Sequence, residues 1–361
     1  MSKQVGLRWT TSSVEITEEI WPDRLMGPFL PVSSWDIDLF NDSFSDEIDS
    51  AFSSSICCCD LCYDCFRTNW PDVAFREMEF QKNSMEVSWV LENSRIPGFY
   101  SPTELSTLSH FVRCVRCEQF VPHNIWIYEH KFSDAEEIET AINELLIIGN
   151  TTPFLLLNHE FAQQVFKEIS EAAASPRRLK ADRSLFRARV AVDVANLNQT
   201  INAIATYAPP PAQFVGEGRF NHAGTPMLYL ASAPEVAAAE IGIPGETCHV
   251  AELKLLQDIV VLDLVDLDED SPDFQLMQAL ASSALLSAPN SGSGWLKKQY
   301  VFSRFVGDCA RAAGFDAIRY GSTKNVNGSN IVLLEPPTDV TNLFDLIDVK
   351  GLTGLQPAKR F

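Results

Sequence analysis

The residues best suited to chemistry in this chain lie close together in the sequence. Arg219 belongs to a loop with glycines on both sides, Gly218 directly before it and Gly224 after Asn221. Tyr229 follows in an apolar run, and Glu240 comes next among small apolar residues. Glycine lets a loop backbone approach a ligand closely, and a planar guanidinium group suits a phosphate or a carboxylate. An arginine loop followed by a carboxylate in apolar surroundings therefore indicates a binding or catalytic site.

Local signals predict the elements that must position these side chains. Residues 227–231 are largely apolar and predict a strand that carries Tyr229. Ser232 and Glu235 have the spacing of a capping box, and a proline lies in the first turn, where its missing N–H costs nothing. A helix that begins at Ser232 would carry Glu240.

Three separated blocks of the chain, in this order, resemble the RES family, and the resemblance covers roughly the C-terminal half. The first block is 184–189, which contains Arg187 after an aromatic residue. The second is the arginine, tyrosine and glutamate segment described above. The third is 314–322, which ends on Ser322 and is followed by an apolar run at 330–334.

The resemblance implies an enzyme that consumes NAD⁺ and has a fold similar to the ADP-ribosyltransferases. Some members of the family hydrolyse NAD⁺, and others transfer its ADP-ribosyl group to inorganic phosphate. Either reaction breaks the bond between nicotinamide and ribose. The resemblance implies that Arg187 and Arg219 hold the pyrophosphate and that Tyr229 packs on the nicotinamide or its ribose. It assigns catalysis to Glu240 and contact with the ribose or phosphate to Ser322. Asn221, from the arginine loop, is expected beside them.

The reaction requires these residue types. Breaking a glycosidic bond builds positive charge on the ribose, so a fixed carboxylate such as Glu240 stabilises the transition state more than the ground state. Two arginines bind a pyrophosphate through paired hydrogen bonds, which lysine does less well. Each residue alone has an ordinary structural interpretation: Arg219 as an exposed loop arginine, Tyr229 as a core tyrosine and Ser322 as a turn residue. Their joint order favours a common site.

The composition is that of a large acidic protein. The chain has 361 residues and 46% hydrophobic content, so it can bury a sizeable core. Its 48 acidic and 28 basic residues give a net charge of -20, which repels nucleic-acid phosphates and anionic membranes. No apolar run has the length of a membrane span, and the N-terminus lacks the pattern of a signal peptide. We expect a cytoplasmic protein without nucleic-acid or membrane partners, and the sequence leaves a homo-oligomer open.

The first part of the chain is strongly acidic. Serine is frequent and hydrophobic periodicity is poor from Ser33 to Ser55, so we expect residues 1–55 to be an acidic, partly irregular segment. Four apolar residues within it have near-helical spacing and are candidates for docking on the body of the protein or on a partner: Trp21, Leu25, Phe29 and Leu30.

The cysteines give a second chemical signal. Seven of the nine fall in two groups, and two pairs have the two-residue spacing that turns both thiolates toward one ion: Cys62-x-x-Cys65 and Cys114-x-x-Cys117. These four thiolates predict a closed, tetrahedral structural Zn²⁺ site. Cys59 with Cys62 is an alternative first pair in a different register. A disulfide needs an oxidising compartment, and a redox dithiol favours a helix after a strand; neither feature is evident.

The order of elements favours an α+β fold. Residues 56–175 predict a small α+β cysteine-rich, zinc-binding domain, and 176–361 predict an ADP-ribosyltransferase-like RES domain. Within the latter we expect strands at 250–255 and 259–264 and a helix at 274–287. No Gly-x-Gly-x-x-Gly follows a strand, which argues against a hydride-transferring Rossmann enzyme.

We therefore expect an NAD⁺ glycohydrolase or NAD⁺ phosphorylase that acts as a toxin by depleting cellular NAD⁺. An ADP-ribosyltransferase that modifies a protein or nucleic acid is one alternative, and a zinc-dependent interaction module without activity is another. The resemblance also implies an inhibitor. No helix-turn-helix antitoxin segment is evident in the chain, so a separately encoded antitoxin or immunity protein is expected.

Overall fold

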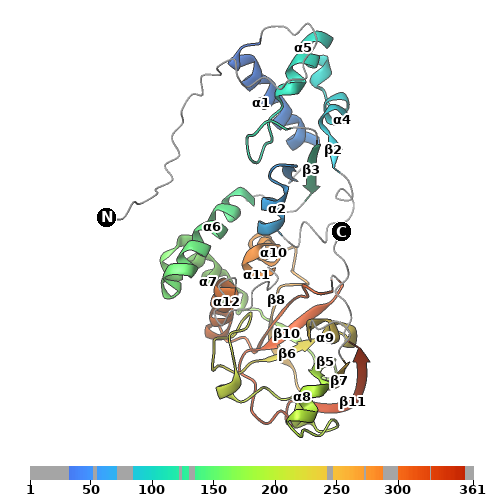
Figure 1. The fold of residues 1–361 in the computed structure, drawn as a ribbon. Helices are drawn as coiled ribbons and strands as arrows, with labels where there is room; N and C mark the ends of the chain where they lie inside the picture. The colour runs from blue at the N-terminus through green and yellow to red at the C-terminus, as the bar shows by residue number, and fades with distance from the viewer. Residues whose placement is uncertain are drawn as a thin grey trace, which may run out of the picture.

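The computed structural model describes most of the chain, namely residues 32–51, 55–70, 84–121, 124–129, 135–241, 247–271, 274–287, 300–325 and 327–353. The apolar residues predicted as a docking segment, from Trp21 to Leu30, lie outside this part. The molecule is elongated, with the N-terminal helices and a small sheet at one end and a large sheet at the other (Figure 1). The mixture of helices and sheets confirms the α+β class.

The N-terminal part is built on a three-stranded antiparallel sheet with the order β1-β3-β2. Its strands are β1 (Ser55–Cys59), β2 (Met85–Glu86) and β3 (Asn124–Glu129). The helices around it are α1 (Ser34–Ala51), α2 (Tyr63–Asn69), α4 (Val87–Glu92), η2 (Ile96–Gly98), α5 (Pro102–Leu108) and η3 (Ser109–Phe111).

Helix α1 corrects the expectation of an irregular segment. Its buried side chains follow helical spacing and lie in one apolar core with the small sheet: Ile37, Phe40, Phe44 and Ile48. Glu47 on the same helix binds Arg95, whose Nε lies 2.6 Å from the Glu47 carboxylate. The many serines and aspartates of this segment occupy the remaining faces, which concealed the apolar stripe in the sequence.

Helices α6 (Ala135–Thr151) and α7 (Glu160–Ala172), joined by η4 (Pro153–Asn158), link the two parts of the molecule. A single apolar core contains Phe66 and Trp70 of the cysteine-rich part, Val165 of α7, and Phe302 and Ile318 of the C-terminal part. The cysteine-rich part, α6, α7 and the C-terminal part therefore share one apolar core.

The C-terminal part is an eight-stranded sheet with the order β11-β7-β5-β6-β10-β9-β8-β4. Its strands are β4 (Arg177–Leu179), β5 (Ser184–Val190), β6 (Leu228–Ala231), β7 (Thr247–Leu255), β8 (Ile259–Asp263), β9 (Ala317–Gly321), β10 (Ser329–Leu333) and β11 (Phe344–Thr353). Neighbouring strands are antiparallel except β8 and β9, which are parallel. The strands predicted around 227–231, 250–255 and 259–264 all form.

Helices and short 3₁₀ turns complete the C-terminal part: α8 (Ala191–Asn196), η5 (Ile204–Tyr207), η6 (Ala212–Phe214), α9 (Pro234–Ile241), α10 (Phe274–Ser282), α11 (Ala284–Ser287) and α12 (Val301–Ala312). The helix predicted over 274–287 is divided at Ser283, whose hydroxyl donates to the Leu280 carbonyl. None of the described helices is long and apolar enough to span a bilayer.

Candidate active site

A cavity of about 570 Å³ lies beside strands β5 and β6, helix α9 and the loop that follows η6. Four of the residues proposed from the sequence line it: Arg187, Asn221, Tyr229 and Glu240. Aromatic and small apolar side chains make up most of the remaining wall, including Phe186, Phe214 and Tyr320. The fold therefore brings together groups that are separated by more than fifty residues in the chain.

The Glu240 carboxylate is held by two hydrogen bonds at the end of α9. Ser322 Oγ donates to Glu240 Oε1 over 2.6 Å, and Asn330 Nδ2 donates to the same oxygen over 2.8 Å. Ser322 follows strand β9 and Asn330 lies in strand β10, so two neighbouring strands fix one carboxylate oxygen. Both donors are almost fully buried, whereas Glu240 itself is exposed. The Glu240 carboxylate is thus oriented before any ligand is present.

The start of α9 differs from the predicted capping box. The helix begins at Pro234, and Ser232 Oγ accepts a hydrogen bond of 3.0 Å from the Ser329 backbone N–H. Gly328, the residue before Ser329, packs closely against α9: an added Cβ would lie 2.4 Å from a Val236 methyl group. The serine therefore ties α9 to the start of β10, which brings Glu240 close to Asn330.

Tyr229 fixes the loop that contains the second arginine. Its hydroxyl donates to Asn221 Oδ1 over 2.9 Å and accepts from the Phe220 backbone N–H over 3.1 Å. Burial raises the pKa of Tyr229 to about 12, so the hydroxyl stays protonated. Gly218 leaves room for this contact, because an added Cβ would lie 2.1 Å from Asn221 Oδ1.

Arg187 presents a half-buried cation to the cavity. Its NH1 group donates to the Tyr229 carbonyl over 3.2 Å, whereas its buried Nε has no hydrogen-bond partner in the described part of the chain. Burial, with the nearby charge of Arg189, lowers the pKa of Arg187 to about 10. An anion that accepted from Nε would relieve both the missing bond and the uncompensated charge.

Arg219 does not line this cavity. Its guanidinium group stacks near two rings, 5.1 Å from the centre of Tyr300 and 5.7 Å from that of Tyr320, and NH1 donates to the Leu286 carbonyl. It is absent from the residues that line the cavity, although Tyr320 is among them. The described structure therefore brings Arg187 to the cavity wall and keeps Arg219 behind Tyr320.

Sequence reasoning missed two polar residues of this cavity. Asn330 is an amide with an exposed fraction of only 4%, and Glu217 is a second carboxylate in the wall. Arg304 NH1 lies 3.4 Å from Glu217 Oε2. Two features of the sequence could have indicated them: Asn330 is a polar residue at the start of the apolar run at 330–334, and Glu217 is an acidic residue directly before the arginine loop.

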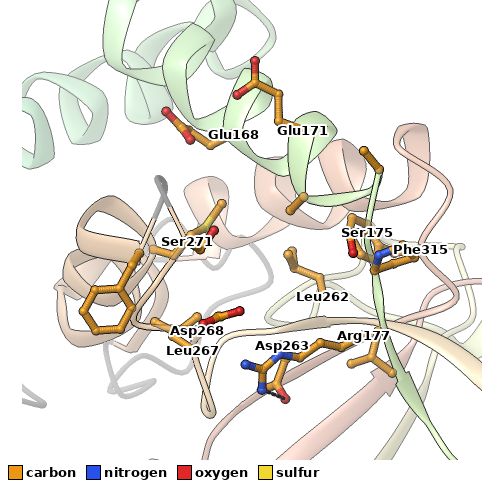
Figure 2. Close-up of a pocket in the computed structure, with 16 residues that line it drawn as sticks. Glu168, Glu171, Ser175, Arg177, Leu262, Asp263, Leu267, Asp268, Ser271 and Phe315 are labelled. Carbon is orange, nitrogen blue, oxygen red and sulfur yellow. Dashed lines mark ion pairs between the residues drawn. The ribbon is translucent and has the colours of Figure 1, made fainter.

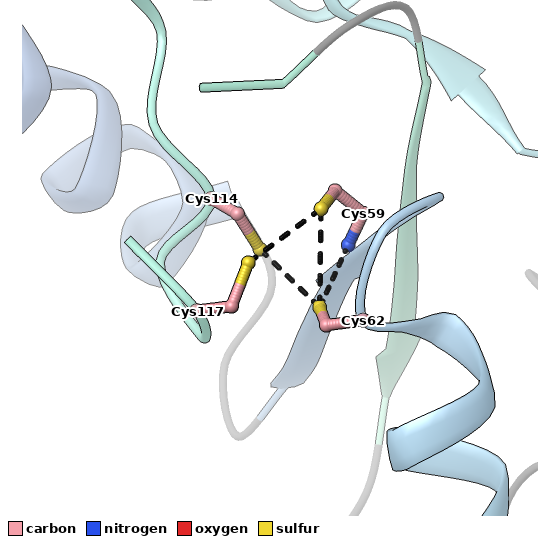
Figure 3. Close-up of side chains that lie close together, drawn as sticks. All are labelled: Cys59, Cys62, Cys114 and Cys117. Atoms are coloured by element: carbon pink, nitrogen blue, oxygen red, sulfur yellow. Dashed lines mark hydrogen bonds between the residues drawn. The ribbon is translucent and has the colours of Figure 1, made fainter. Parts of the chain in front are cut away.

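The cysteine cluster contains Cys59 in place of the predicted Cys65. The Sγ atoms of Cys59, Cys62, Cys114 and Cys117 all lie within 4.8 Å of one another (Figure 3). The Sγ–Sγ distances are 3.9 Å for Cys59–Cys62, 3.7 Å for Cys59–Cys117 and 3.8 Å for Cys62–Cys114. Four sulfurs around one zinc ion at the usual Zn–S distance would lie about 3.8 Å apart. The described geometry therefore suits a tetrahedral metal ion.

The correction from Cys65 to Cys59 has a local cause. Strand β1 ends at Cys59, and the chain turns there, so the Cys59 N–H donates to Cys62 Sγ over 3.3 Å. Cys65 lies one turn into α2 and is exposed. On the other side, Cys114 and Cys117 flank a second tight turn, which Glu118 closes with a positive φ of 59°. Two such turns facing each other form the cluster.

A second cavity, of about 630 Å³, lies between α7 and strand β8 (Figure 2). Its wall carries several carboxylates, among them Glu168, Glu171 and Asp268, and Arg177 is paired with Asp263 at 3.8 Å. None of the residues proposed from the sequence lines this cavity.

Comparisons with known proteins agree with the C-terminal assignment. Residues 185–343 match the model of the family described as the RES domain. No curated protein matches the chain. Among solved structures, the chain is similar to one from M. tuberculosis, a crystal structure of the MbcT–MbcA toxin–antitoxin complex, with 16% identity, 54% of this chain and 94% of that chain covered, and a TM-score of 0.33. Resemblance that remote carries no argument about function. The family match and the three motif blocks fall on the same segment, so residues 185–343 of this chain are similar to the RES domain.

Proposed function

We propose that the RES domain binds NAD⁺ in the 570 Å³ cavity and breaks the bond between nicotinamide and ribose. The volume lies within the range of small-molecule sites. The single observation that carries the proposal is the Glu240 carboxylate, which Ser322 and Asn330 hold at the cavity wall. Among the described residues that line the cavity, Arg187 is the one cation.

Arg187 is proposed to bind the pyrophosphate. Its unpartnered Nε and its lowered pKa both favour an anionic guest, and a guanidinium group can donate to two phosphate oxygens at once. Tyr229 supports this position, since its carbonyl accepts a hydrogen bond from Arg187 NH1, and Asn221 Oδ1 accepts from the Tyr229 hydroxyl. The aromatic wall of Phe186, Tyr229 and Tyr320 offers surfaces against which a nicotinamide ring can pack.

The chemistry follows from the position of the carboxylate. When the bond between the ribose C1″ and the nicotinamide nitrogen breaks, its electron pair stays on nitrogen and nicotinamide leaves as a neutral molecule. Positive charge then develops on the ribose ring, and Glu240 Oε2, which neither Ser322 nor Asn330 occupies, is placed to stabilise it. An acceptor then bonds to C1″. In this scheme Ser322 orients the carboxylate and makes no contact with the reacting atoms.

We also propose that the cysteine cluster binds one structural Zn²⁺ ion. All four positions of a tetrahedral ion would be filled by Cys59, Cys62, Cys114 and Cys117, which leaves none for a substrate. A role in stability is therefore favoured over a role in catalysis. In the cell, an enzyme that depletes NAD⁺ would act as a toxin, and we propose that a separately encoded antitoxin restrains it.

Incubation of the purified chain with NAD⁺ tests the proposed activity. Chromatography should show free nicotinamide together with an equal amount of an ADP-ribosyl product. The same incubation with NADH, whose nicotinamide is not a cationic leaving group, should give no release. Intact NAD⁺ after prolonged incubation with protein that melts cooperatively would contradict the proposal, and ADP-ribose attached to a macromolecule would favour a transferase.

A further inference from the structure

We infer that the ADP-ribosyl acceptor is water rather than inorganic phosphate, and that Glu217 is the residue that excludes phosphate from the cavity. This inference rests on the proposed function and specifies the reaction at the same site. It is carried by the charges that line the cavity, by the position of Arg219 and by the way in which Glu217 is held.

The described lining is poor in cations. Arg187 is its one cationic side chain, whereas Glu217 and Glu240 are both carboxylates. NAD⁺ itself brings two negative charges on its pyrophosphate, and Arg187 is the group placed to receive them. A phosphate acceptor would add about two further negative charges in a cavity with no second cation in its described wall.

Arg219 does not fill this gap. The sequence assigned Arg219 to the pyrophosphate together with Arg187, and a second arginine at the wall could also have held an acceptor phosphate. Its guanidinium group is instead engaged with the Leu286 carbonyl and with the rings of Tyr300 and Tyr320. Ser303 also donates its hydroxyl to the Arg219 carbonyl, which anchors the backbone of this residue to α12. The arginine thus supports the aromatic wall from behind.

Glu217 is held as a fixed negative charge. Arg304, with an exposed fraction of 4%, pairs with it from α12 but does not line the cavity. The Glu217 side chain keeps 20% of its surface accessible. The ion pair with Arg304 holds this carboxylate in place at the cavity wall. Gly216 and Gly218 on either side line the cavity through their backbone and add no screening side chain.

Water avoids this repulsion because it is neutral. In hydrolysis, the water oxygen bonds to C1″, the C1″–N electron pair leaves with neutral nicotinamide, and one proton passes to the solvent. Phosphorolysis would instead join a phosphate oxygen to C1″ and give ADP-ribose 1″-phosphate. The two reactions release the same nicotinamide, so the identity of the second product distinguishes them.

The first experiment measures products from NAD⁺ at increasing inorganic phosphate, with ionic strength held constant by a chloride salt. Phosphorus NMR distinguishes ADP-ribose from its 1″-phosphate. We expect ADP-ribose as the main product at every phosphate concentration, with only a small share of the 1″-phosphate, and no rise in the rate of nicotinamide release. Formation of the 1″-phosphate as the main product would overturn the inference and leave the proposed function standing. Absence of nicotinamide release would instead overturn the proposed function itself.

The second experiment tests Glu217 with the Glu217→Gln variant, which keeps the shape of the side chain and removes its charge. We expect the share of ADP-ribose 1″-phosphate at high phosphate to rise roughly tenfold over the wild type, the scale of removing one charge near a dianion at a partly solvated site. Glu235→Gln is the matched control, since Glu235 is an exposed residue of α9 outside the cavity wall. An unchanged product ratio in a folded Glu217→Gln protein would overturn the role of Glu217. A loss of stability alone changes the rate of both reactions and leaves their ratio unaltered.

Discussion

The cysteine cluster and the Glu240 site are both assembled from residues far apart in the chain, but they are stabilised in opposite ways. The four sulfurs of the cluster converge on one point, and we propose that a metal ion holds them together. The Glu240 carboxylate already has its partners, because Ser322 and Asn330 donate to it from the sheet. In this proposal the first site depends on a metal ion for its structure, whereas the Glu240 carboxylate is held by the protein itself.

The largest expected effect comes from breaking the cluster. Cys114→Ser should abolish binding of about one zinc ion per chain and remove a folding contribution on the order of 10 kcal/mol, the scale for structural zinc in small domains. We expect limited proteolysis to cleave within residues 56–170, while the Glu240 site stays intact. Elemental analysis of protein purified without a histidine tag measures the metal.

Cys65→Ser is the matched control for the cluster. Its thiol is exposed and lies outside the set of four converging sulfurs. Zinc content and protease resistance should equal those of the wild type. Loss of zinc from Cys65→Ser but not from a Cys59→Ser variant would restore the pairing expected from the sequence.

Removing the charge of Glu240 should have the next largest effect. Glu240→Gln keeps the side-chain shape and should lower turnover of NAD⁺ by at least ~100-fold, the scale of deleting one group that stabilises transition-state charge. NAD⁺ binding should persist, as measured by calorimetry. Glu235→Gln on the same helix should retain full activity. Near-normal turnover in Glu240→Gln would show that the preorganised carboxylate is structural.

The arginine loop can be tested through its glycine. Gly218→Ala would place a Cβ 2.1 Å from Asn221 Oδ1 and 2.9 Å from the Tyr229 hydroxyl, so the loop must shift. We expect a loss of about 2 kcal/mol in the free energy of unfolding, typical of overpacking, and a lower melting temperature. Gly216→Ala is the control, because its Cβ would meet nothing within 4 Å. Equal melting temperatures for the two variants would mean that the contact is not rigid.

The smallest expected effect is a difference in NAD⁺ affinity between variants of Arg187 and Arg219. Arg187→Lys should weaken NAD⁺ binding roughly tenfold, since an ammonium group cannot replace paired guanidinium hydrogen bonds. Arg219→Lys should change affinity less, because Arg219 does not line the cavity. Calorimetry on the Glu240→Gln background avoids consumption of the ligand. Equal losses in both variants would indicate that Arg219 turns into the cavity when NAD⁺ binds.

Short-range patterns in the sequence predicted much of the fold. The strand that carries Tyr229 and the helix that carries Glu240 both depend on neighbouring residues, and both form. Helix α1 was missed, because its apolar stripe is narrow and is surrounded by serine and aspartate. Paired Cys-x-x-Cys spacing indicated a metal cluster for the same local reason, since two intervening residues close a turn.

The sequence by itself determined the residue types of both sites: a pair of cysteine turns, an arginine loop and a carboxylate on a helix. Only the tertiary structure decided which members meet. Cys59 replaces Cys65 because β1 ends where the turn begins, and Arg219 leaves the cavity because the Tyr300 and Tyr320 rings offer it a stacking site. Asn330 joins Glu240 because β10 pairs with β6, the strand that leads into α9. Such contacts depend on strand order and helix placement over long chain separations, which no local pattern encodes.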